Sequence, residues 1–358
     1  MNWDKLPPLP PSAGQAKQPG EAGPFAGVHG DALIVAGGAN FPDKLPWEGG
    51  AKIWWDDVWV LEGLSSNSPR WFSGAALKLP RPLGYGISVD LPEGVLCAGG
   101  HDVDRCYADV FILSWDAKAK KLVKTDLPPM PEPLSFMAGA LVGDTLYVAG
   151  GQTTMKNAVP SKHFWALDLS KRKSGASELK WQVLPSWPGP ARVLPVAAAQ
   201  SSAKGPEFFL FSGRTPEAGK PTQLLADAYA YDPQAKAWRT LPPVGTGLPG
   251  AGTKGLSVMA GSAAAVGPSE IWLFGGDRGD LFLELEKHDL AIAAARAAGK
   301  TADVDAGLAA KKAIYARHPG FAREVLAYDA VKNTWRVAAM TPENLAPQVT
   351  TLAVKHRD

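Results

Sequence analysis

Polar side chains follow doublets of small residues at several points along this 358-residue chain. Six of them stand within a few residues of a doublet: Asn40, His101, Arg105, Arg214, Asp277 and Arg278. Arginine binds carboxylates in a two-point geometry, and carboxylate or imidazole groups accept and return protons. We therefore expect these residues to form a polar mouth that binds an anion and supports proton transfer.

Four more residues join this candidate set. Arg81 and Arg192 each stand just before an apolar run, while Glu48 lies in a loop after the first doublet and Glu284 begins a charged segment. For any one of them, a solvated or ion-paired loop residue is the simpler interpretation. Together with the first six they favour a substrate-binding mouth in which the catalytic residue itself stays unknown.

The doublets recur along the chain. They stand 62, 51, 62 and 63 residues apart, at Gly37-Gly38, Gly99-Gly100, Gly150-Gly151, Ser212-Gly213 and Gly275-Gly276. Each ends an apolar run typical of a strand that is buried on both faces. A strand-based repeat of this length predicts an all-β fold, a kelch-type β-propeller. Because propeller blades do not bury their faces alone, we expect a single domain over residues 1–358.

Each repeat continues in the same way after its doublet. A polar loop leads to a second apolar strand, and a tryptophan then marks the outermost strand in four repeats, at Trp71, Trp181, Trp238 and Trp335. A proline-rich loop follows and returns the chain toward the axis. These glycines and tryptophans are interpreted as scaffold, since glycine permits close backbone approach and tryptophan fills the space between blades.

The chain ends complete the blade count. Residues 3–10 read like residues 238–243, so residues 1–10 are predicted to form the outermost strand that closes the last blade. Residues 349–358 are predicted to hold the innermost strand of the same blade, over 349–354. We therefore expect a six-bladed propeller whose sixth blade is incomplete in this chain, through truncation or a deficient blade.

One segment breaks the repeat. Residues 281–321 are rich in Ala, Lys and Glu, which favour helix, and a Gly299-Lys300-Thr301 break divides them. We expect two helices inserted in the fifth blade. They serve either as a solvent-exposed addition or as a lid over the central opening, and the sequence favours neither.

Composition excludes several classes of protein. The net charge of +2, from 37 basic and 35 acidic residues, offers no broad basic field for nucleic acid. No apolar run is long enough to span a membrane, and no zinc spacing or phosphate-binding glycine loop occurs. The two cysteines, Cys97 and Cys106, are expected to be free thiols, although a pair between them stays open. We expect no metal and no organic cofactor.

Several stretches carry a resemblance to a known family. The segments 37–42, 46–52 and 55–58 resemble the first blade of the N-acetylneuraminate epimerases (sialic acid mutarotases), in their cyclically permuted branch. Leu83–Val89 and Pro188–Arg192 are also similar to this family, as is a helical insertion after a Gly-Gly doublet. The resemblance extends over essentially the whole chain.

The resemblance implies interconversion of the α and β anomers of sialic acid by acid/base catalysis in the central pocket. It also implies a Glu that acts as the catalytic base and an Arg that binds the substrate carboxylate. When the order of the family's blades is compared with this chain, both residues are expected beyond Asp358. The partner implied is a small-molecule sugar acid, without nucleic acid or membrane.

A second class of function stays open. A non-catalytic kelch propeller would bind a protein or glycan through a flat or apolar patch, whereas a mutarotase needs a deep axial pocket lined by several Arg and a carboxylate. The resemblance implies a periplasmic protein, but the first residues show no export signal, so a cytoplasmic protein is the alternative. Oligomeric state stays open.

Overall fold

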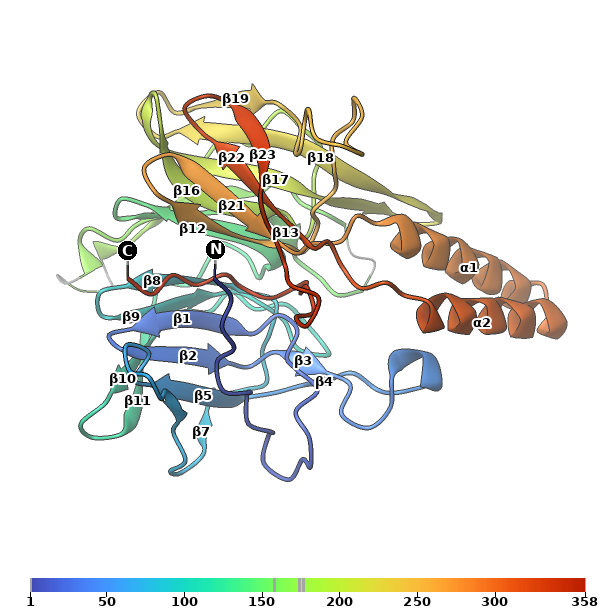
Figure 1. Cartoon of the computed structure of the whole chain (residues 1–358), viewed down its shortest axis with the longest axis horizontal. Coiled ribbons are helices and arrows are strands. Elements are labelled where there is room, and N and C mark those ends of the chain that lie inside the picture. The colour runs from blue at the N-terminus through green and yellow to red at the C-terminus, as the bar shows by residue number, and fades with distance from the viewer. Residues whose placement is uncertain (1, 157–158, 173–174, 176–177, 358) are drawn as a thin grey trace.

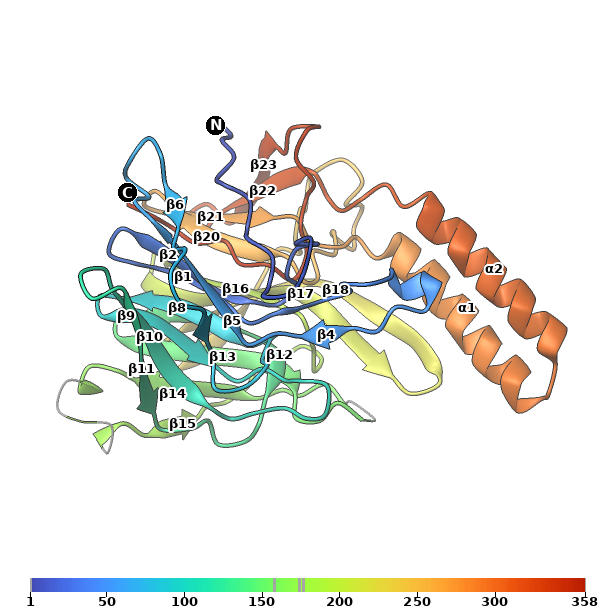
Figure 2. The same cartoon turned by 90° about the horizontal axis from the view of Figure 1, so that it is seen from below.

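Five antiparallel sheets radiate from a common axis in the computed structural model of the chain (Figures 1 and 2). The structure describes residues 2–156, 159–172, 175 and 178–357; Met1 and Asp358, the ends of the predicted domain, lie outside these ranges. Each sheet contains four strands in order from the axis outward, and the first has a short fifth strand. This arrangement confirms the predicted kelch-type β-propeller.

The strands occupy equivalent positions from sheet to sheet. The innermost strands are β1 (Phe25–His29), β8 (Ile87–Leu91), β12 (Ser135–Val142), β16 (Val196–Ser202) and β20 (Ser262–Val266). The second strands are β2 (Ala32–Ala36), β9 (Gly94–Ala98), β13 (Thr145–Gln152), β17 (Gly205–Glu217) and β21 (Glu270–Phe274). The third strands are β5 (Asp57–Glu62), β10 (Val110–Asp116), β14 (Phe164–Asp168), β18 (Lys220–Asp232) and β22 (Glu324–Asp329).

The outermost strands are shorter or more exposed. They are β6 (Arg70–Trp71) with β7 (Leu77–Lys78), β11 (Lys121–Leu127), β15 (Trp181–Val183), β19 (Ala237–Leu241) and β23 (Thr334–Met340). In the first blade, the loop after the doublet carries a small ribbon of β3 (Ala39–Asn40) and β4 (Ile53–Trp54) and a 3-10 turn, η1 (Pro46–Glu48).

Burial explains why the second strands are continuous apolar runs. All five residues of β9 are buried, and so is the Phe208–Phe211 stretch of β17. The side chains on each blade pack against the next blade, so that one cluster unites Phe211 of the fourth sheet with Tyr328 and Trp335 of the fifth. Burial on both faces removes the alternation expected of a half-exposed strand.

A closed ring of backbone hydrogen bonds surrounds the axis. Six residues, one from each innermost segment, are joined by backbone hydrogen bonds with N to O distances of 2.6 to 3.0 Å: Gly23, Tyr85, Phe136, Leu194, Ala260 and Thr350. All six have positive φ, and five of them are not glycine. Left-handed backbone at such residues costs energy and persists where the surroundings enforce it. The ring supplies that constraint, and Thr350 occupies its sixth position.

The doublets lie where this ring meets the neighbouring blade. A Cβ atom at Gly37 would stand 2.1 Å from the carbonyl oxygen of Leu83, so only glycine fits. Ser212 takes the equivalent place in the fourth blade with φ +55°. Its hydroxyl donates to Leu225 O at 2.7 Å and accepts from Val258 N at 2.9 Å, which compensates the conformational cost.

Tryptophans of the outermost strands tie four of the five blades to the return loop that precedes them. The indole N–H donates to a proline carbonyl of the preceding return loop at 2.8 to 3.4 Å, in the pairs Trp71–Pro7, Trp181–Pro128, Trp238–Pro185 and Trp335–Pro242. Pro7 therefore meets the first blade as the return loops of other blades meet their neighbours.

The strands predicted at the two chain ends are not formed. No strand is assigned to residues 2–10 or 349–354, because a ladder needs a partner strand and these segments have none in the described chain. The C-terminal segment instead runs along the axis (Figure 1), where Thr350 bonds Ala260, just before β20, and Gly23, just before β1.

Two helices interrupt the fifth blade, as predicted. They are α1 (Asp280–Ala297) and α2 (Thr301–Ala316), and they project from the propeller on the side of β4 and the β17–β18 hairpin (Figure 2). Ile292 and Ala295 of α1 and Ile314 of α2 are their buried side chains. The tip of α2 returns to the first blade, where Tyr315 stacks on Trp47 with ring centres 4.4 Å apart.

Cys97 and Cys106 are both buried, free thiols. None of the described helices has the length and apolar character to cross a membrane.

Candidate functional site

Equivalent positions after the doublets gather on one face of the propeller. The residue after each doublet forms a bridge with the residue just before the ring position of its blade. These positions are occupied, from the first blade to the fifth, by Ala39, His101, Gln152, Arg214 and Asp277. Because the bridge recurs with the same register, all five lie at the same end of the axial channel, called here the doublet face.

A basic and aromatic cluster stands on the doublet face between the first and second blades. It consists of Lys52, Trp54, Tyr85, His101 and Ser135 and is called the Lys52 cluster below. The Lys52 ammonium donates to Tyr85 Oη and lies 4.4 Å from the centre of the Tyr85 ring and 5.3 Å from that of Trp54. Such contacts stabilise a cation without neutralising it.

The imidazole of His101 forms the floor of this cluster. Only 1% of His101 is exposed. Its ring stacks on Tyr85 at 4.9 Å, and its Nδ1 lies 2.6 Å from Ser135 Oγ. Burial lowers the pKa of His101 to about 4, and the nearby positive charge of Lys52 adds to the shift. The ring is therefore neutral at pH 7.

Burial also controls the other ionisable groups of the Lys52 cluster. It lowers the pKa of Lys52 to about 8 because the ammonium loses water. Burial raises the pKa of the Tyr85 phenol, and Glu21 adds to that shift. At pH 7 the cluster thus carries one positive charge, on Lys52.

Glu21 precedes β1 and is a buried carboxyl group next to this cluster. Burial raises its pKa to about 8, with a further contribution from Asp57, so the group is protonated at pH 7. Asn40 donates from Nδ2 to Glu21 Oε1 at 2.9 Å, while Asn40 Oδ1 accepts from Trp55 Nε1 at 2.9 Å. The indole N–H only donates, so it defines the orientation of the Asn40 amide.

The two oxygens of Glu21 differ in their surroundings. Oε1 accepts the Asn40 hydrogen bond. Oε2 is buried and has no hydrogen-bond partner among the described residues. A buried oxygen of this kind lacks the partner that a purely structural carboxyl group normally has.

Arg192 is buried at the same face but is fully bonded. Its side chain has 0% exposure, and Nη1 and Nη2 donate to the two oxygens of Asp227 at 2.8 and 2.7 Å. Nη1 also reaches Ser212 O at 2.8 Å, and the guanidinium lies between the Trp187 and Tyr229 rings. Arg192 therefore holds the fourth blade together and has no free donor pair for a ligand.

Arg214 and Asp277 occur where the helices leave the propeller. The Arg214 guanidinium stacks on Phe282 of α1 at 4.5 Å, and its Nε is buried without a partner in the described chain. Burial lowers the pKa of Arg214. Asp277 accepts from Gly279 N at 2.7 Å, just before α1. Arg214 is thus a second incompletely bonded cation of the doublet face.

The remaining predicted residues make local contacts. Arg278 bonds Ser257 O at 3.1 Å and Glu324 at 3.3 Å, and Glu284 pairs with Arg317 at 2.6 Å. Arg81 pairs with Asp109 at 2.7 Å. Glu48 is exposed in η1 and accepts from Leu45 N, and the exposed Arg105 lies over the Tyr107 ring. These contacts are those of ordinary structural residues.

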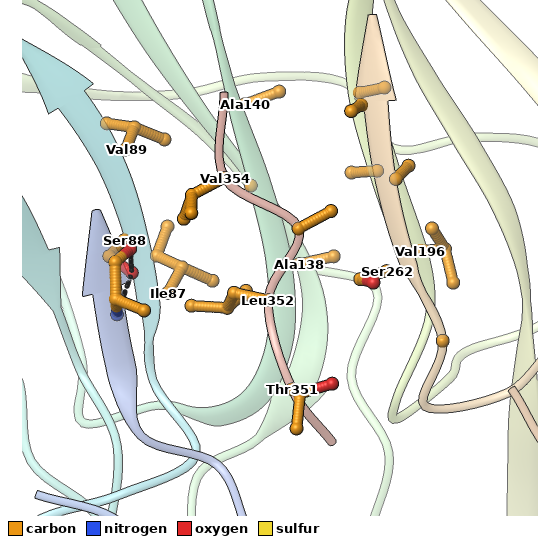
Figure 3. Close-up of a pocket in the computed structure, with 18 of the residues that line it drawn as sticks. Ile87, Ser88, Val89, Ala138, Ala140, Val196, Ser262, Thr351, Leu352 and Val354 are labelled. Atoms are coloured by element: carbon orange, nitrogen blue, oxygen red, sulfur yellow. Dashed lines mark hydrogen bonds between the residues drawn. The ribbon is translucent and has the colours of Figure 1, made fainter. Parts of the chain in front are cut away.

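An axial cavity of about 390 Å³ begins beneath the ring and is mainly apolar. Alanine side chains of β12, β16 and β20 line it, and Leu352 and Val354 of the C-terminal segment point toward Ile87 across it (Figure 3). The charged residues in its described lining are Asp90 and Lys355. The expectation of an axial pocket lined by several Arg is therefore wrong for this cavity, because the arginines are engaged at the doublet face and between blades.

Sequence reasoning missed Glu21, Lys52, Tyr85 and Ser135 as site residues. Lys52 and Tyr85 lie inside segments that carried the family resemblance, so their position was a usable signal. Glu21 has no such signal, because it is a single acidic residue in a Gly- and Pro-rich stretch. Only the folded chain shows that it is buried beside Asn40.

Comparison with known proteins identifies the family. The N-acetylneuraminate epimerase family model matches residues 1–122 and 127–357. A protein named N-acetylneuraminate epimerase from Brucella melitensis is 42% identical over 128 residues, which are 33% of this chain and 31% of the relative. A Haemophilus influenzae protein of the same name is 27% identical over 218 residues, 60% of this chain and 49% of the relative.

A third relative, from Salmonella enteritidis, bears the same name and is 37% identical over 111 residues, 28% of this chain and 27% of the relative. The chain thus spans less than half the length of each of these relatives. The family match covers nearly every residue and agrees with the propeller architecture. The chain belongs to the N-acetylneuraminate epimerase family.

Proposed function

We propose that this chain is a sugar mutarotase, which interconverts the α and β anomers of N-acetylneuraminate or a related acidic sugar. Membership of the family and the names of the relatives support this proposal. The site that we assign to it is the doublet face around the Lys52 cluster. Its partner is then a small-molecule sugar acid, and we retain the periplasm as the proposed compartment.

Mutarotation requires modest chemistry. A proton must reach the ring oxygen, another must leave the anomeric hydroxyl, and a cation must hold the carboxylate. The observation that carries the proposal is the combination of a protonated carboxyl group at Glu21, a neutral imidazole at His101 and an ammonium at Lys52. Groups with pKa values on either side of neutrality suit acid/base work near pH 7. We leave the catalytic base unassigned.

Anomer equilibration tests the proposal directly. Freshly dissolved N-acetylneuraminate relaxes between its anomers, and proton NMR records the rate with and without protein. We expect the native protein to accelerate relaxation and the heat-unfolded protein to have no effect. An unchanged rate in the presence of folded protein would contradict the mutarotase proposal.

The alternative is a non-catalytic propeller that binds a glycan or protein. The apolar lining of the axial cavity favours it, because that cavity lacks the arginines that an axial mutarotase pocket needs. The same NMR titration separates the two functions. Binding detected by broadened sugar signals, together with an unaltered anomerisation rate, would support the binding protein.

A further inference from the structure

The Lys52 ammonium is partly buried from solvent and has no counter-ion among the described residues. We propose that Lys52 and the Tyr85 hydroxyl form the subsite that binds the carboxylate of the sugar acid. This inference rests on the proposed function and assigns the acidic group of the substrate to a specific place on the doublet face, where Lys52 takes the role that the family resemblance gives to an Arg.

The contacts of Lys52 leave hydrogen-bonding capacity for a ligand. An ammonium group has three N–H donors, and Lys52 gives one hydrogen bond to Tyr85 Oη. Its other close neighbours are the Tyr85 and Trp54 rings, which attract the charge but accept no conventional hydrogen bond. Within the described ranges, Lys52 forms no ion pair with a carboxylate.

The groups that face Lys52 do not neutralise it. His101 and Tyr85 are uncharged at pH 7, and Glu21 is protonated. Asp102 is ionised, but its oxygens accept from Tyr107 and from the amides of Asp104 and Arg105. Asp57, which faces Glu21, is paired with Lys78 at 2.9 Å. The Lys52 cluster therefore keeps a net charge of +1, which no carboxylate around it neutralises.

A carboxylate matches the uncompensated positive charge of the Lys52 cluster both in charge and in shape. Its single negative charge equals the single positive charge of the Lys52 cluster. Its two oxygens can accept from the Lys52 ammonium and from the Tyr85 hydroxyl, which are already adjacent. Charge-assisted hydrogen bonds in a site of low water content are stronger than neutral ones.

The same groups make binding sensitive to alkaline pH. Above about pH 8, Lys52 loses its proton and Glu21 ionises, so the site loses positive charge and gains negative charge. Both changes oppose an anion. Binding near pH 8.5 should therefore take up protons, because the bound carboxylate raises the pKa of its neighbours.

Isothermal titration calorimetry tests this subsite with two probes, N-acetylneuraminate and its uncharged methyl ester. We expect the native protein to bind the acid at least about 10-fold more tightly than the ester at pH 7, which is a typical effect of a charge-assisted hydrogen bond. In K52M this preference should vanish. In the control K162M, which changes an exposed lysine 6.0 Å from the Trp187 ring, it should remain.

A conservative variant guards against a folding defect. K52R keeps a cation that does not deprotonate, so it should retain the preference for the acid and show a smaller fall in affinity above pH 8, where only Glu21 still ionises. Titrations in two buffers of different ionisation enthalpy measure the proton uptake. An acid-to-ester ratio in folded K52M equal to that of the native protein would overturn the assignment of Lys52.

The two proposals fail in different ways. Anomer acceleration with an unchanged acid preference in K52M would remove the Lys52 subsite and leave the mutarotase function. A Lys52-dependent acid preference without acceleration would support the subsite and remove the catalytic function. Binding of neither probe by the native protein would overturn the carboxylate subsite and count against an acidic-sugar substrate.

Discussion

Two cations at the doublet face, Arg192 and Lys52, are both withdrawn from water but differ in how they are bonded. Arg192 meets both oxygens of Asp227 and a backbone carbonyl, between two aromatic rings. Lys52 lies between aromatic rings as well, but its hydrogen bond goes to an uncharged phenol. The difference separates a charge that builds the fold from a charge that is available to a ligand.

The free energies explain this separation. A buried charge is tolerated when its partner and hydrogen bonds replace water, and removing one member of such a pair is strongly destabilising. A buried charge without a partner costs stability in the folded protein. Proteins retain such costs mainly at functional sites, so Lys52 indicates function more strongly than Arg192, although only Arg192 was predicted from the sequence as a site residue.

The largest effect should come from Arg192→Met. This change leaves Asp227 without its bidentate partner and removes a hydrogen bond to Ser212 O, so we expect a loss of about 3–5 kcal/mol in the free energy of unfolding. Chemical denaturation measures it. The control Arg81→Met breaks a half-exposed pair with Asp109 and should cost less than about 1 kcal/mol. Equal losses in both variants would contradict the structural role of Arg192.

Glu21→Gln should change how stability depends on pH. The pKa of Glu21 is raised from 4.5 to about 8 on folding, so its stabilising contribution is complete below about pH 4.5 and is lost as pH rises through 8. Glutamine keeps an oxygen for Asn40 and does not ionise. We expect equal stability of variant and native protein at pH 4.5 and a gain of about 2 kcal/mol for the variant at pH 8.5, less than the roughly 5 kcal/mol of the full pKa shift because structural relaxation and water penetration lower the cost of the buried anion.

Denaturation curves of both proteins across this range check the prediction for Glu21. Glu48→Gln is the matched control, because Glu48 is exposed in η1. A parallel pH dependence in native protein and Glu21→Gln would show that Glu21 ionises normally in the folded chain.

Lys52→Met should stabilise the protein, in contrast with Arg192→Met. The pKa of Lys52 falls from 10.5 to about 8 on folding, so its stabilising contribution is present above pH 10.5 and is lost as pH falls through 8. Removing the buried ammonium relieves roughly 3 kcal/mol at pH 7, but the variant also loses the Tyr85 hydrogen bond and the contacts with two aromatic rings, so we expect a net gain of about 1 kcal/mol. Thermal unfolding measures the gain, and a lower melting temperature than that of the native protein would mean that Lys52 is a structural cation.

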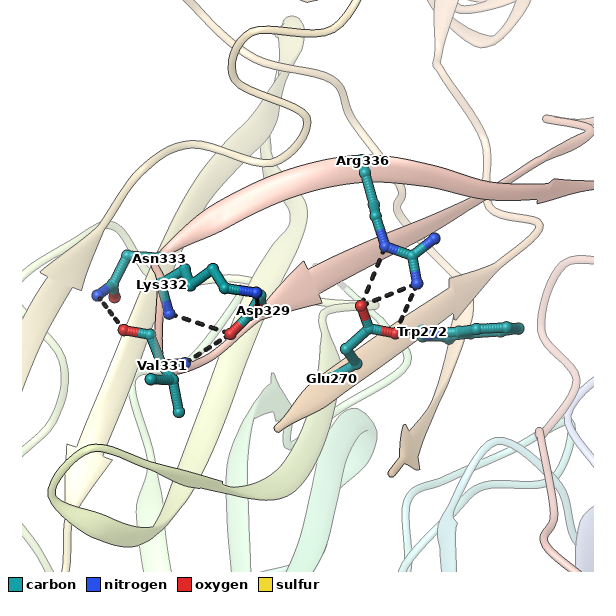
Figure 4. A network of polar contacts seen from close by, with 7 residues as sticks. All are labelled: Glu270, Trp272, Asp329, Val331, Lys332, Asn333 and Arg336. Atoms are coloured by element: carbon teal, nitrogen blue, oxygen red, sulfur yellow. Dashed lines mark hydrogen bonds and ion pairs between the residues drawn. The ribbon is translucent and has the colours of Figure 1, made fainter. Parts of the chain in front are cut away.

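The smallest effect should come from an ion pair at the other end of the fifth blade. Arg336 of β23 bonds both oxygens of Glu270, which also accepts from Trp272 Nε1 (Figure 4). Half of the Arg336 side chain is exposed, so water competes with the pair. We expect Arg336→Met to cost about 0.5 kcal/mol. A loss comparable with that of Arg192→Met would show that bidentate geometry, rather than burial, determines the energy.

Much of the architecture could be predicted from local patterns. The doublets, the apolar runs and the spaced tryptophans recur along the chain. Every repeat therefore predicts the same order of strands. The helix-forming residues over 281–321 predicted the insertion, found as α1 and α2. Such patterns are readable because strand and helix periodicities are properties of short segments.

The candidate site could be predicted only in part. Asn40 and His101 were selected because they follow doublets, and both do lie at the doublet face beside Glu21 and Lys52. Arg81, Glu48 and Glu284 were selected on other grounds, before an apolar run, in the loop after the first doublet and at the start of the insertion, and their hydrogen bonds and ion pairs are with neighbouring protein groups. Position after a doublet predicts the face on which a residue lies, but it does not predict whether another side chain neutralises it.

The sequence by itself determined the repeat, the blade order and the place of the helical insertion, because these follow from local periodicity. Only the tertiary structure decided that Thr350 completes the hydrogen-bonded ring and that Glu21 and Lys52 lose their water beside Asn40 and Tyr85. Lys52 and Tyr85 are 33 positions apart. The charge state of such groups depends on burial and on neighbours from other blades, which no single segment of the sequence contains.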